Sequence, residues 1–310
     1  MVIRPPEEEL GSDFGTYDAL TQLGCDLTGY APIVLSNAWM HGDSVAWAIE
    51  HRGIVCFCVE LWNGMEHVLK LHDEEFDHTA DLGSGPVSPN MVGTREEDFA
   101  RLYQFLDENF AAEEYVQSWS AFEHPQLGAV EIGGMDSKKC VQNPPPALLE
   151  AECEKNTAFS LALLGSLPAV QTSVATEPLD PEAADVEDGG PRRVRVTLSN
   201  QGFLPTYGAQ RAVDMKVVRA HGVATLRVSG DVTLLHGEAL VEVPHLSGRS
   251  AAYDGESPVA SAWGASAANP HEATVEWVVQ GSGTLDIEVD YQRGGKHRCS
   301  VHIGGGAAKL

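Results

Sequence analysis

The segment Gly42–Leu61 contains residue types that could carry out chemistry. Within it the run Ile54–Leu61 is apolar and partly β-branched apart from the carboxylate of Glu60. A continuous apolar run of this length is typical of a buried strand, and alternation places Glu60 on the same face as Cys56 and Cys58. Ligands of open α/β sheets usually bind at the carboxyl ends of strands. Glu60 is therefore a candidate acid–base residue, and a solvated strand-end glutamate is the alternative.

The elements around Glu60 change character near Pro168. Up to that point the pattern mixes helices with strands, which predicts an α/β or α+β domain over residues 1–168. After it come short alternating strands separated by turn residues, which predict an antiparallel, immunoglobulin-like β-sandwich over residues 169–310. The acidic stretch Glu177–Pro191 is predicted to be a long loop. The predicted helices cover residues 17–27, 44–51, 98–110 and 147–167, and the predicted strands cover residues 54–61, 129–132, 193–199, 213–219, 224–229, 239–243, 273–279, 283–291 and 297–303.

Composition excludes several kinds of partner. The formal net charge is -25, with 45 Asp and Glu against 20 Lys and Arg. Because a surface this acidic repels phosphate backbones, no nucleic-acid partner is expected. Acidity is also an ordinary means of staying soluble. No apolar run of about 18 residues occurs, so we expect no transmembrane helix and no membrane partner. The start, Met1–Glu9, lacks the apolar core of a signal peptide.

The cysteines favour free thiols over disulfides or zinc ligands. Six occur, and neither a C-x-x-C pair nor a zinc-finger spacing is present. Cys56 and Cys58 lie within the apolar run, where buried thiols are the expected form. This pattern favours a reducing compartment.

Three histidines gather in an acidic stretch. His67, His72 and His78 lie among Asp and Glu residues, and His72 could share a helix face with Glu75 in a substitute metal site. The spacing matches neither H-E-x-x-H nor a zinc finger, so a solvated acidic segment is favoured.

Three further features are predicted to be structural or to carry no function. His124 precedes Pro125 and is predicted to be a turn residue. Glu131 is read as a strand carboxylate without a catalytic role. The pair Arg192–Arg193 is too small a basic patch for nucleic acid in so acidic a chain.

Several stretches, taken in order, resemble the zinc carboxypeptidase family (peptidase family M14). In its late motif a Gly, an Asp-Trp pair, a second Gly and an apolar strand lead to a catalytic Glu followed by Leu or Ile. The matching residues here are Gly42, Trp47, Gly53, Glu60 and Leu61. The stretches 119–128, 130–134, 143–146 with the helix that follows, and 200–207 look like a bacterial and archaeal branch of the family. The resemblance covers nearly the whole chain.

The resemblance implies a partial carboxypeptidase-like mixed sheet with helices, and zinc-dependent removal of C-terminal residues from peptides. In the family, zinc activates a water molecule and polarises the scissile carbonyl. The strand-end Glu takes a proton from that water and passes it to the leaving amine. The resemblance assigns this role to Glu60.

The chain departs from the family pattern in its metal ligands. The family binds zinc through an early His-x-x-Glu and a later His that opens an HTFSG-like segment, and both precede the catalytic Glu. Here the only His-x-x-Glu is His72–Glu75, which follows Glu60. The segment Met1–Pro5 resembles the residues just after the later His, so we expect the printed sequence to start downstream of the ligands. Ala46 stands where the family has Asp, and no Tyr occurs between Ala31 and Val59.

Two hypotheses follow. The chain is the late part of a metallocarboxypeptidase that is inactive without the missing ligands, or it is a non-enzymatic binding or scaffold module with a decayed peptidase remnant. If the family's neighbouring strand is missing, the Ile54–Leu61 strand should lie at a sheet edge and expose apolar surface.

Overall fold

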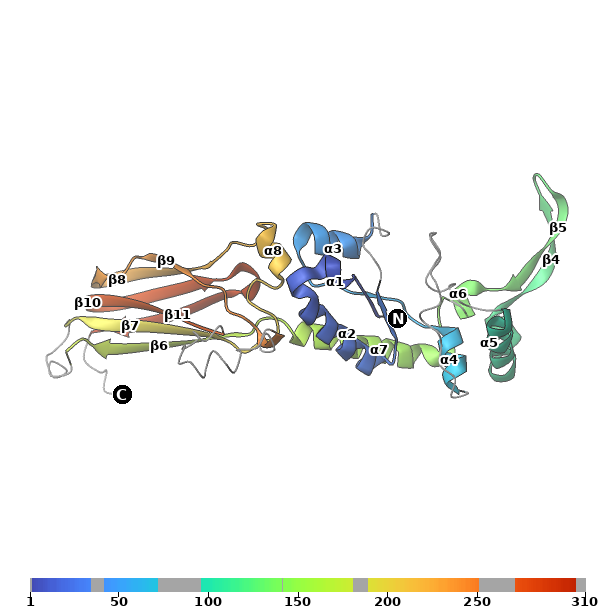
Figure 1. Ribbon diagram of the computed structural model, residues 1–310, viewed down its shortest axis with the longest axis horizontal. Coiled ribbons are helices and arrows are strands. Elements are labelled where there is room, and N and C mark those ends of the chain that lie inside the picture. The colour runs from blue at the N-terminus through green and yellow to red at the C-terminus, as the bar shows by residue number, and fades with distance from the viewer. Residues whose placement is uncertain are drawn as a thin grey trace. The chain divides into compact units, whose positions relative to one another are not determined.

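A computed structural model describes residues 2–34, 42–71, 96–140, 142–180, 189–250 and 271–304. The chain forms two compact units, and each contains segments that are distant in sequence (Figure 1). Unit 1 comprises residues 1–10, 20–41 and 57–162, and unit 2 comprises residues 11–19, 42–56 and 163–310. The predicted division at residue 168 stays a prediction. Among the described helices, none is both long and apolar enough to cross a membrane.

Helices and small sheets make up the first half of the chain. The helices are α1 (Glu7–Leu10), α2 (Phe14–Thr28), α3 (Ser44–Arg52), α4 (Gly64–Leu71), α5 (Glu96–Asn109), α6 (Ser137–Cys140) and α7 (Pro146–Gly165). The strands are β1 (Val2–Arg4), β2 (Pro32–Val34), β3 (Cys58–Val59), β4 (Val116–His124) and β5 (Gly128–Met135). The predictions of α2, α3, α5, α7 and β5 are confirmed to within a few residues. β1, β2, β4 and α4 were not predicted.

β1 is the central strand of a three-stranded mixed sheet in unit 1. It pairs with β2 in parallel and with β3 antiparallel. Among the described strands, β3 pairs with β1. The predicted sheet edge stays a prediction. The predicted strand Ile54–Leu61 is wrong in length, because regular pairing is restricted to Cys58–Val59. Ile54 keeps 43% of its surface exposed, so the expected burial of the run is only partial.

The second half of the chain forms a six-stranded antiparallel sheet. Its elements are β6 (Val170–Pro178), β7 (Arg192–Asn200), α8 (Gln210–Asp214), β8 (Gly222–His236), β9 (Leu240–Val243), β10 (Glu272–Asp290) and β11 (Lys296–Ile303). The strand order is β6-β7-β10-β8-β9, and β11 also pairs with β10. The first part of β10 pairs with β7 and its last part with β8 and β11. β10 thus joins two groups of strands.

Alternate side chains of these strands fill one apolar core. Val196 on β7, Leu226 on β8, and Trp277 and Ile287 on the two halves of β10 all belong to it. The exposed fraction of Trp277 is 0%, and its indole N–H donates to the carbonyl of Glu238 at 2.8 Å. Both halves of β10 therefore contribute to one core.

Two predictions within this region are wrong. The strands expected at 273–279 and 283–291 are one strand, because Gly281, at φ 112°, and Gly283 allow β10 to continue through the break. A Cβ added to Gly281 would lie 1.8 Å from the carbonyl oxygen of Asp231, so only glycine permits this close pairing with β8. The strand expected at 213–219 is instead the end of α8 and a turn.

A contact distant in sequence explains α8. The carboxylate of Asp13 accepts hydrogen bonds from the backbone N–H groups of Gln210 at 2.7 Å and Arg211 at 3.0 Å. These N–H groups lie at the start of α8 and would otherwise lack partners. Asp13 is nearly 200 residues away in sequence, so local patterns could not show this cap.

Candidate functional site

Glu60 follows directly after β3 at the edge of the mixed sheet. The residue is half-buried, and the Cys58 thiol donates to its Oε1 at 4.0 Å. This contact agrees with the prediction that Cys58 and Glu60 share a face.

The other residues of the Gly42–Leu61 motif have clear structural roles. Asp43 caps α3, because its Oδ1 accepts from the N–H groups of Val45 and Ala46. Gly53 ends α3 at φ 55°, and an added Cβ would lie 2.5 Å from the backbone nitrogen of Ala212. Glycine is therefore required there by conformation and by close packing. Ala46 is buried, so the position of the family's Asp is a packing position here.

These motif residues do not all fall in one compact unit. Trp47 and Gly53 belong to unit 2, and Glu60 belongs to unit 1. The exposed fraction of Trp47 is 54%, and the Arg52 guanidinium lies 5.9 Å from its ring centroid.

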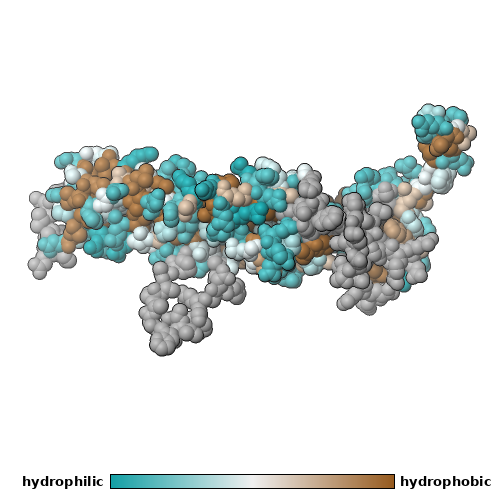
Figure 2. Space-filling model, turned by 45° about the horizontal axis from the view of Figure 1, so that its top comes forward, coloured by the Kyte–Doolittle hydropathy of each residue, from teal (hydrophilic) through white to brown (hydrophobic). Residues whose placement is uncertain are grey.

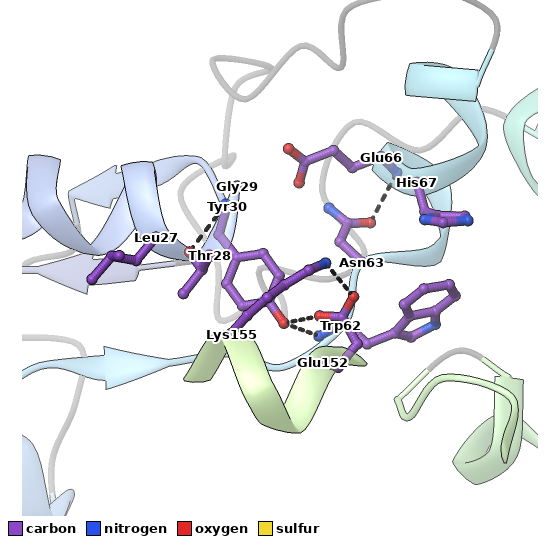
Figure 3. Close-up of a pocket in the computed structure, with 10 residues that line it drawn as sticks. All are labelled: Leu27, Thr28, Gly29, Tyr30, Trp62, Asn63, Glu66, His67, Glu152 and Lys155. Atoms are coloured by element: carbon purple, nitrogen blue, oxygen red, sulfur yellow. Dashed lines mark hydrogen bonds and ion pairs between the residues drawn. The ribbon is translucent and has the colours of Figure 1, made fainter. Parts of the chain in front are cut away.

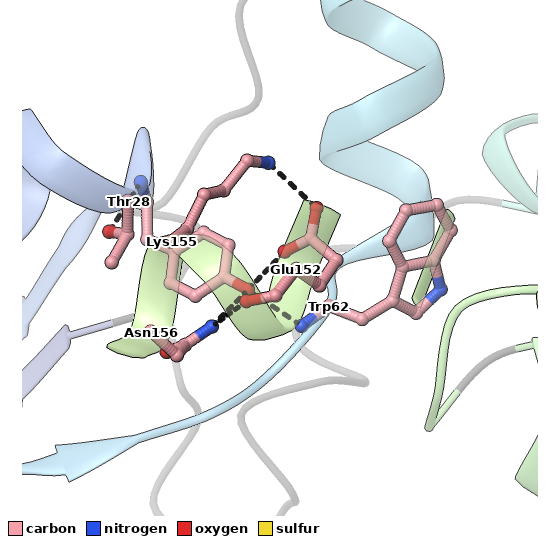
Figure 4. Close-up of polar contacts among 6 residues, drawn as sticks. Thr28, Trp62, Glu152, Lys155 and Asn156 are labelled. Carbon is pink, nitrogen blue, oxygen red and sulfur yellow. Dashed lines mark hydrogen bonds and ion pairs between the residues drawn. The ribbon is translucent and has the colours of Figure 1, made fainter. Parts of the chain in front are cut away.

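The turn after Glu60 is held by a buried tyrosine. Trp62 has a positive φ of 61°, which is uncommon for a bulky residue. Its backbone N–H donates to the hydroxyl oxygen of Tyr30 at 3.3 Å. The same hydroxyl donates to Glu152 Oε2 and accepts from Asn156 Nδ2 at 3.2 Å (Figure 4). Residues from three parts of unit 1 thus fix the backbone just after Glu60.

Glu152 is the buried charge of this network. It is 6% exposed, and its Oε1 accepts from Lys155 Nζ at 2.7 Å (Figure 4). A buried carboxylate is costly unless its oxygens have partners, and here both oxygens have one. Burial and the hydrogen bond to Glu152 raise the pKa of Tyr30 to about 12, so the phenol stays protonated and donates to the carboxylate.

A cavity of about 360 Å³ lies beside this network in unit 1 (Figure 3). The polar residues around it come from the end of α2, the turn after β3, and helices α4 and α7. The residues that line it are Leu27, Thr28, Gly29, Tyr30, Trp62, Asn63, Glu66, His67, Glu152 and Lys155. Two carboxylates and one ammonium group make its charged lining, and the ammonium group of Lys155 is paired with the carboxylate of Glu152.

The remaining candidate residues from the sequence are scattered. The ring of His67 packs between Trp62 and Phe105, with centroid distances of 5.0 and 5.4 Å. His72 and His78, and with them the imagined substitute metal site, lie outside the described residues. His124 Nδ1 accepts from the N–H groups that begin the turn to β5, which confirms a turn residue. Glu131 is exposed on β5.

Zinc is the metal that the family resemblance implies. Within the described ranges, no group of three or more His, Cys, Asp or Glu side chains could hold a metal ion. The described residues therefore do not fit zinc. The five cysteines whose state is described are all free thiols. Cys56 and Cys58 are half-buried rather than buried, and Cys153 is exposed, so the expected burial of the thiols is wrong.

Sequence reasoning missed Tyr30, Glu152 and Lys155. A weak signal existed in the spacing of Glu152, Lys155 and Asn156, which places them on one face of the predicted helix. Nothing local linked them to Tyr30, which is more than 120 residues away.

Comparison with known proteins adds one match and no function. A family described as "Domain of unknown function (DUF8731)" matches residues 176–302, a region that includes β7 to β10, the end of β6 and most of β11. No curated protein matches the chain. The chain is thus similar to that family over most of its six-stranded sheet.

Proposed function

We propose that the chain is the late part of a zinc carboxypeptidase-like protein, that Glu60 is its general base, and that peptide C-termini are its substrates. The observation that supports this is the position of Glu60. Its carboxylate follows β3 and precedes a turn in which Trp62 has an unusual φ and is tied to Tyr30. Unusual backbone conformations that the surroundings enforce are frequent at functional sites.

The same proposal includes the fold type of each half of the chain. The three-stranded mixed sheet would be the remaining part of a carboxypeptidase-like sheet, with residues 1–168 as its domain. The six-stranded antiparallel sheet would be an immunoglobulin-like sandwich over residues 169–310.

Metal analysis and a peptidase assay on the purified chain test the proposal. The printed sequence has no His-x-x-Glu before Glu60, so we expect less than stoichiometric zinc and no release of C-terminal residues from peptides. One bound zinc per chain with chelator-sensitive activity would contradict the assignment of the missing ligands.

The role of Glu60 is tested in a longer form that contains the family's ligands. There Glu60→Gln should keep the zinc and lose about 10²–10⁴-fold in kcat, because an amide cannot accept a proton. Glu131→Gln is the matched control and should keep its activity, since Glu131 is exposed on β5. Near-full activity of the Glu60 variant would reject it as the base.

A second candidate function is a non-enzymatic binding module. The observation that favours it is the preformed cavity, in whose lining Glu152 and Lys155 are already paired. The reading frame before the codon for Met1 separates the two candidates. An in-frame His-x-x-Glu and HTFSG-like segment supports the enzyme, and a stop codon supports the binding module.

A further inference from the structure

The six-stranded sheet has two strand edges that face a groove. A hollow of about 610 Å³ lies between Leu240–Pro244, on and after β9, and Thr274–Glu276 on β10. Among the described strands, β9 pairs only with β8. On the side of β10 away from β7, pairing with β8 begins at Val278. The stretch of β10 from Glu272 to Trp277 therefore has no strand partner on that side within the described residues.

The register shows which backbone groups face the groove from β10. The N–H of Asn200 donates to the carbonyl of His271, so these residues form a hydrogen-bonded pair of the β7–β10 ladder. Alternation along an antiparallel ladder then directs the N–H and C=O groups of Thr274 and Glu276 away from β7.

The same reasoning applies to β9. The N–H of Leu226 donates to the carbonyl of Ala239, which continues the β8–β9 register. Alternation therefore directs the N–H and C=O groups of Leu240 and Glu242 away from β8. Both walls of the groove thus offer backbone groups of the kind that pair with an added strand.

The side chains around the groove combine apolar surface with negative charge. Leu240 is 58% exposed, and Val241 lies half-buried beside it. Figure 2 shows hydrophobic residues gathered over the part of the sheet that carries β8, β9 and β10. Glu238, Glu242 and Glu276 supply three carboxylates, of which Glu276 is paired with Arg195 at 2.5 Å. The net charge of the rim therefore favours a basic partner.

We propose that this groove binds an extended, basic peptide segment by strand addition. The backbone of the peptide pairs with the edge of β10 or β9 that has no strand partner among the described residues. Its apolar side chains lie on the face of Val241, and its alternate Lys or Arg side chains lie on the opposite face, with the stems on Leu240 and the charges near Glu242. The groove lies in unit 2 and within the region matched by the family of unknown function, and the proposal is independent of Glu60.

Fluorescence anisotropy with labelled heptapeptides tests the proposal on the full chain. The basic probe alternates Lys and Val, the acidic probe alternates Glu and Val, and the third probe is the basic probe with Pro at its centre. We expect the basic probe to bind at least about tenfold more tightly than either of the others, because Pro removes a donor and like charges repel. Equal affinity for the basic and Pro probes would overturn strand addition, and equal affinity for the basic and acidic probes would overturn the charge argument.

Paired variants locate the binding surface. Leu240→Ser should weaken the basic probe about tenfold, whereas Leu235→Ser should not, since Leu235 is 49% exposed on β8 but does not line the groove. Glu242→Lys should weaken the basic probe and strengthen the acidic one, whereas Glu150→Lys on α7 changes the net charge equally and should do neither. Thermal melting checks that each variant is folded.

Two results would reject the groove as the site. One is equal affinity of the basic probe for Leu240→Ser, Leu235→Ser and the unchanged protein. The other is a change in self-association on Leu240→Ser, measured by sedimentation, together with no binding of any probe. The second result would assign the edge to another copy of the chain.

Discussion

The six-stranded sheet and the β4–β5 hairpin are both antiparallel, and each carries a tryptophan, but they bury it to opposite extents. Trp277 on β10 is 0% exposed, whereas Trp119 on β4 is 66% exposed. The neighbours of Trp277 come from several strands that enclose one core. β4 pairs only with β5 among the described strands, and its residues are exposed on both faces. The comparison teaches that burial depends on how many strands contribute to a core and not on strand pattern alone.

The Tyr30 network is a third case between these two. Tyr30 and Glu152 are buried like Trp277. The Tyr30 hydroxyl and the Glu152 carboxylate, however, have polar contacts rather than apolar surface around them. An apolar core loses stability with the volume removed. A buried polar network loses it when a partner is left without a hydrogen bond.

The largest effect is expected for Trp277→Ala. Removing a fully buried indole leaves a cavity, which should lower the free energy of unfolding by about 3–5 kcal/mol. Trp47→Ala is the control within unit 2, since Trp47 is 54% exposed and should cost far less. Urea unfolding followed by circular dichroism measures both. Equal losses for the two variants would break the comparison.

An intermediate effect is expected for Tyr30→Phe. The variant leaves a buried carboxylate oxygen of Glu152 without its donor and removes the acceptor of the Trp62 N–H, at a cost of about 1–3 kcal/mol. Tyr103→Phe on α5, where the ring is 39% exposed, serves as the control and should be near neutral. Urea unfolding again provides the free energies. A neutral Tyr30→Phe would show that the network does not stabilise the turn after Glu60.

A pH effect of the same tyrosine should be smaller. Burial and the hydrogen bond to Glu152 raise the folded-state pKa of Tyr30 from 10.0 to about 12. Its contribution is fully present below pH 10 and is lost as pH rises toward 12, because the unfolded chain releases this proton first. Unfolding free energies at several pH values should therefore fall less steeply in Tyr30→Phe than in the unchanged protein. Parallel curves would refute the raised pKa.

The smallest effect is expected for Trp119→Ala. The exposed indole on β4 contributes little burial, so the free energy of unfolding should change by no more than about 0.5 kcal/mol. The same urea titration as for Trp277→Ala makes the two values directly comparable. A loss above about 2 kcal/mol would mean that Trp119 is covered in solution, and the contrast between the two regions would fail.

The sequence predicted much of the fold because many signals are local. Gly53 after an amphipathic segment marked the end of α3, and the alternation of Val194, Val196 and Leu198 marked β7. Pro146 marked the start of α7. Each of these features depends on residues within a few positions of one another, so periodicity and capping rules suffice.

Within the candidate site, the sequence predicted Glu60 at the end of an apolar run. It also predicted that Glu60 and Cys58 share a face. It could not supply Tyr30 and Glu152, because the hydrogen bond between them joins positions 122 residues apart. The sequence pattern also predicted too long a strand for β3, because the number of paired residues depends on the length over which β1 pairs with it.

By itself the sequence determined the helices α2, α3, α5 and α7, the alternation of β7 between core and surface, and the position of the candidate carboxylate. The tertiary structure alone decided the short pairing of β3 with β1, the cap that Asp13 places on α8 and the continuity of β10 through Gly281. The physical reason is that local propensities act over one or two turns of chain, whereas burial, edge exposure and partner choice arise only when distant segments meet.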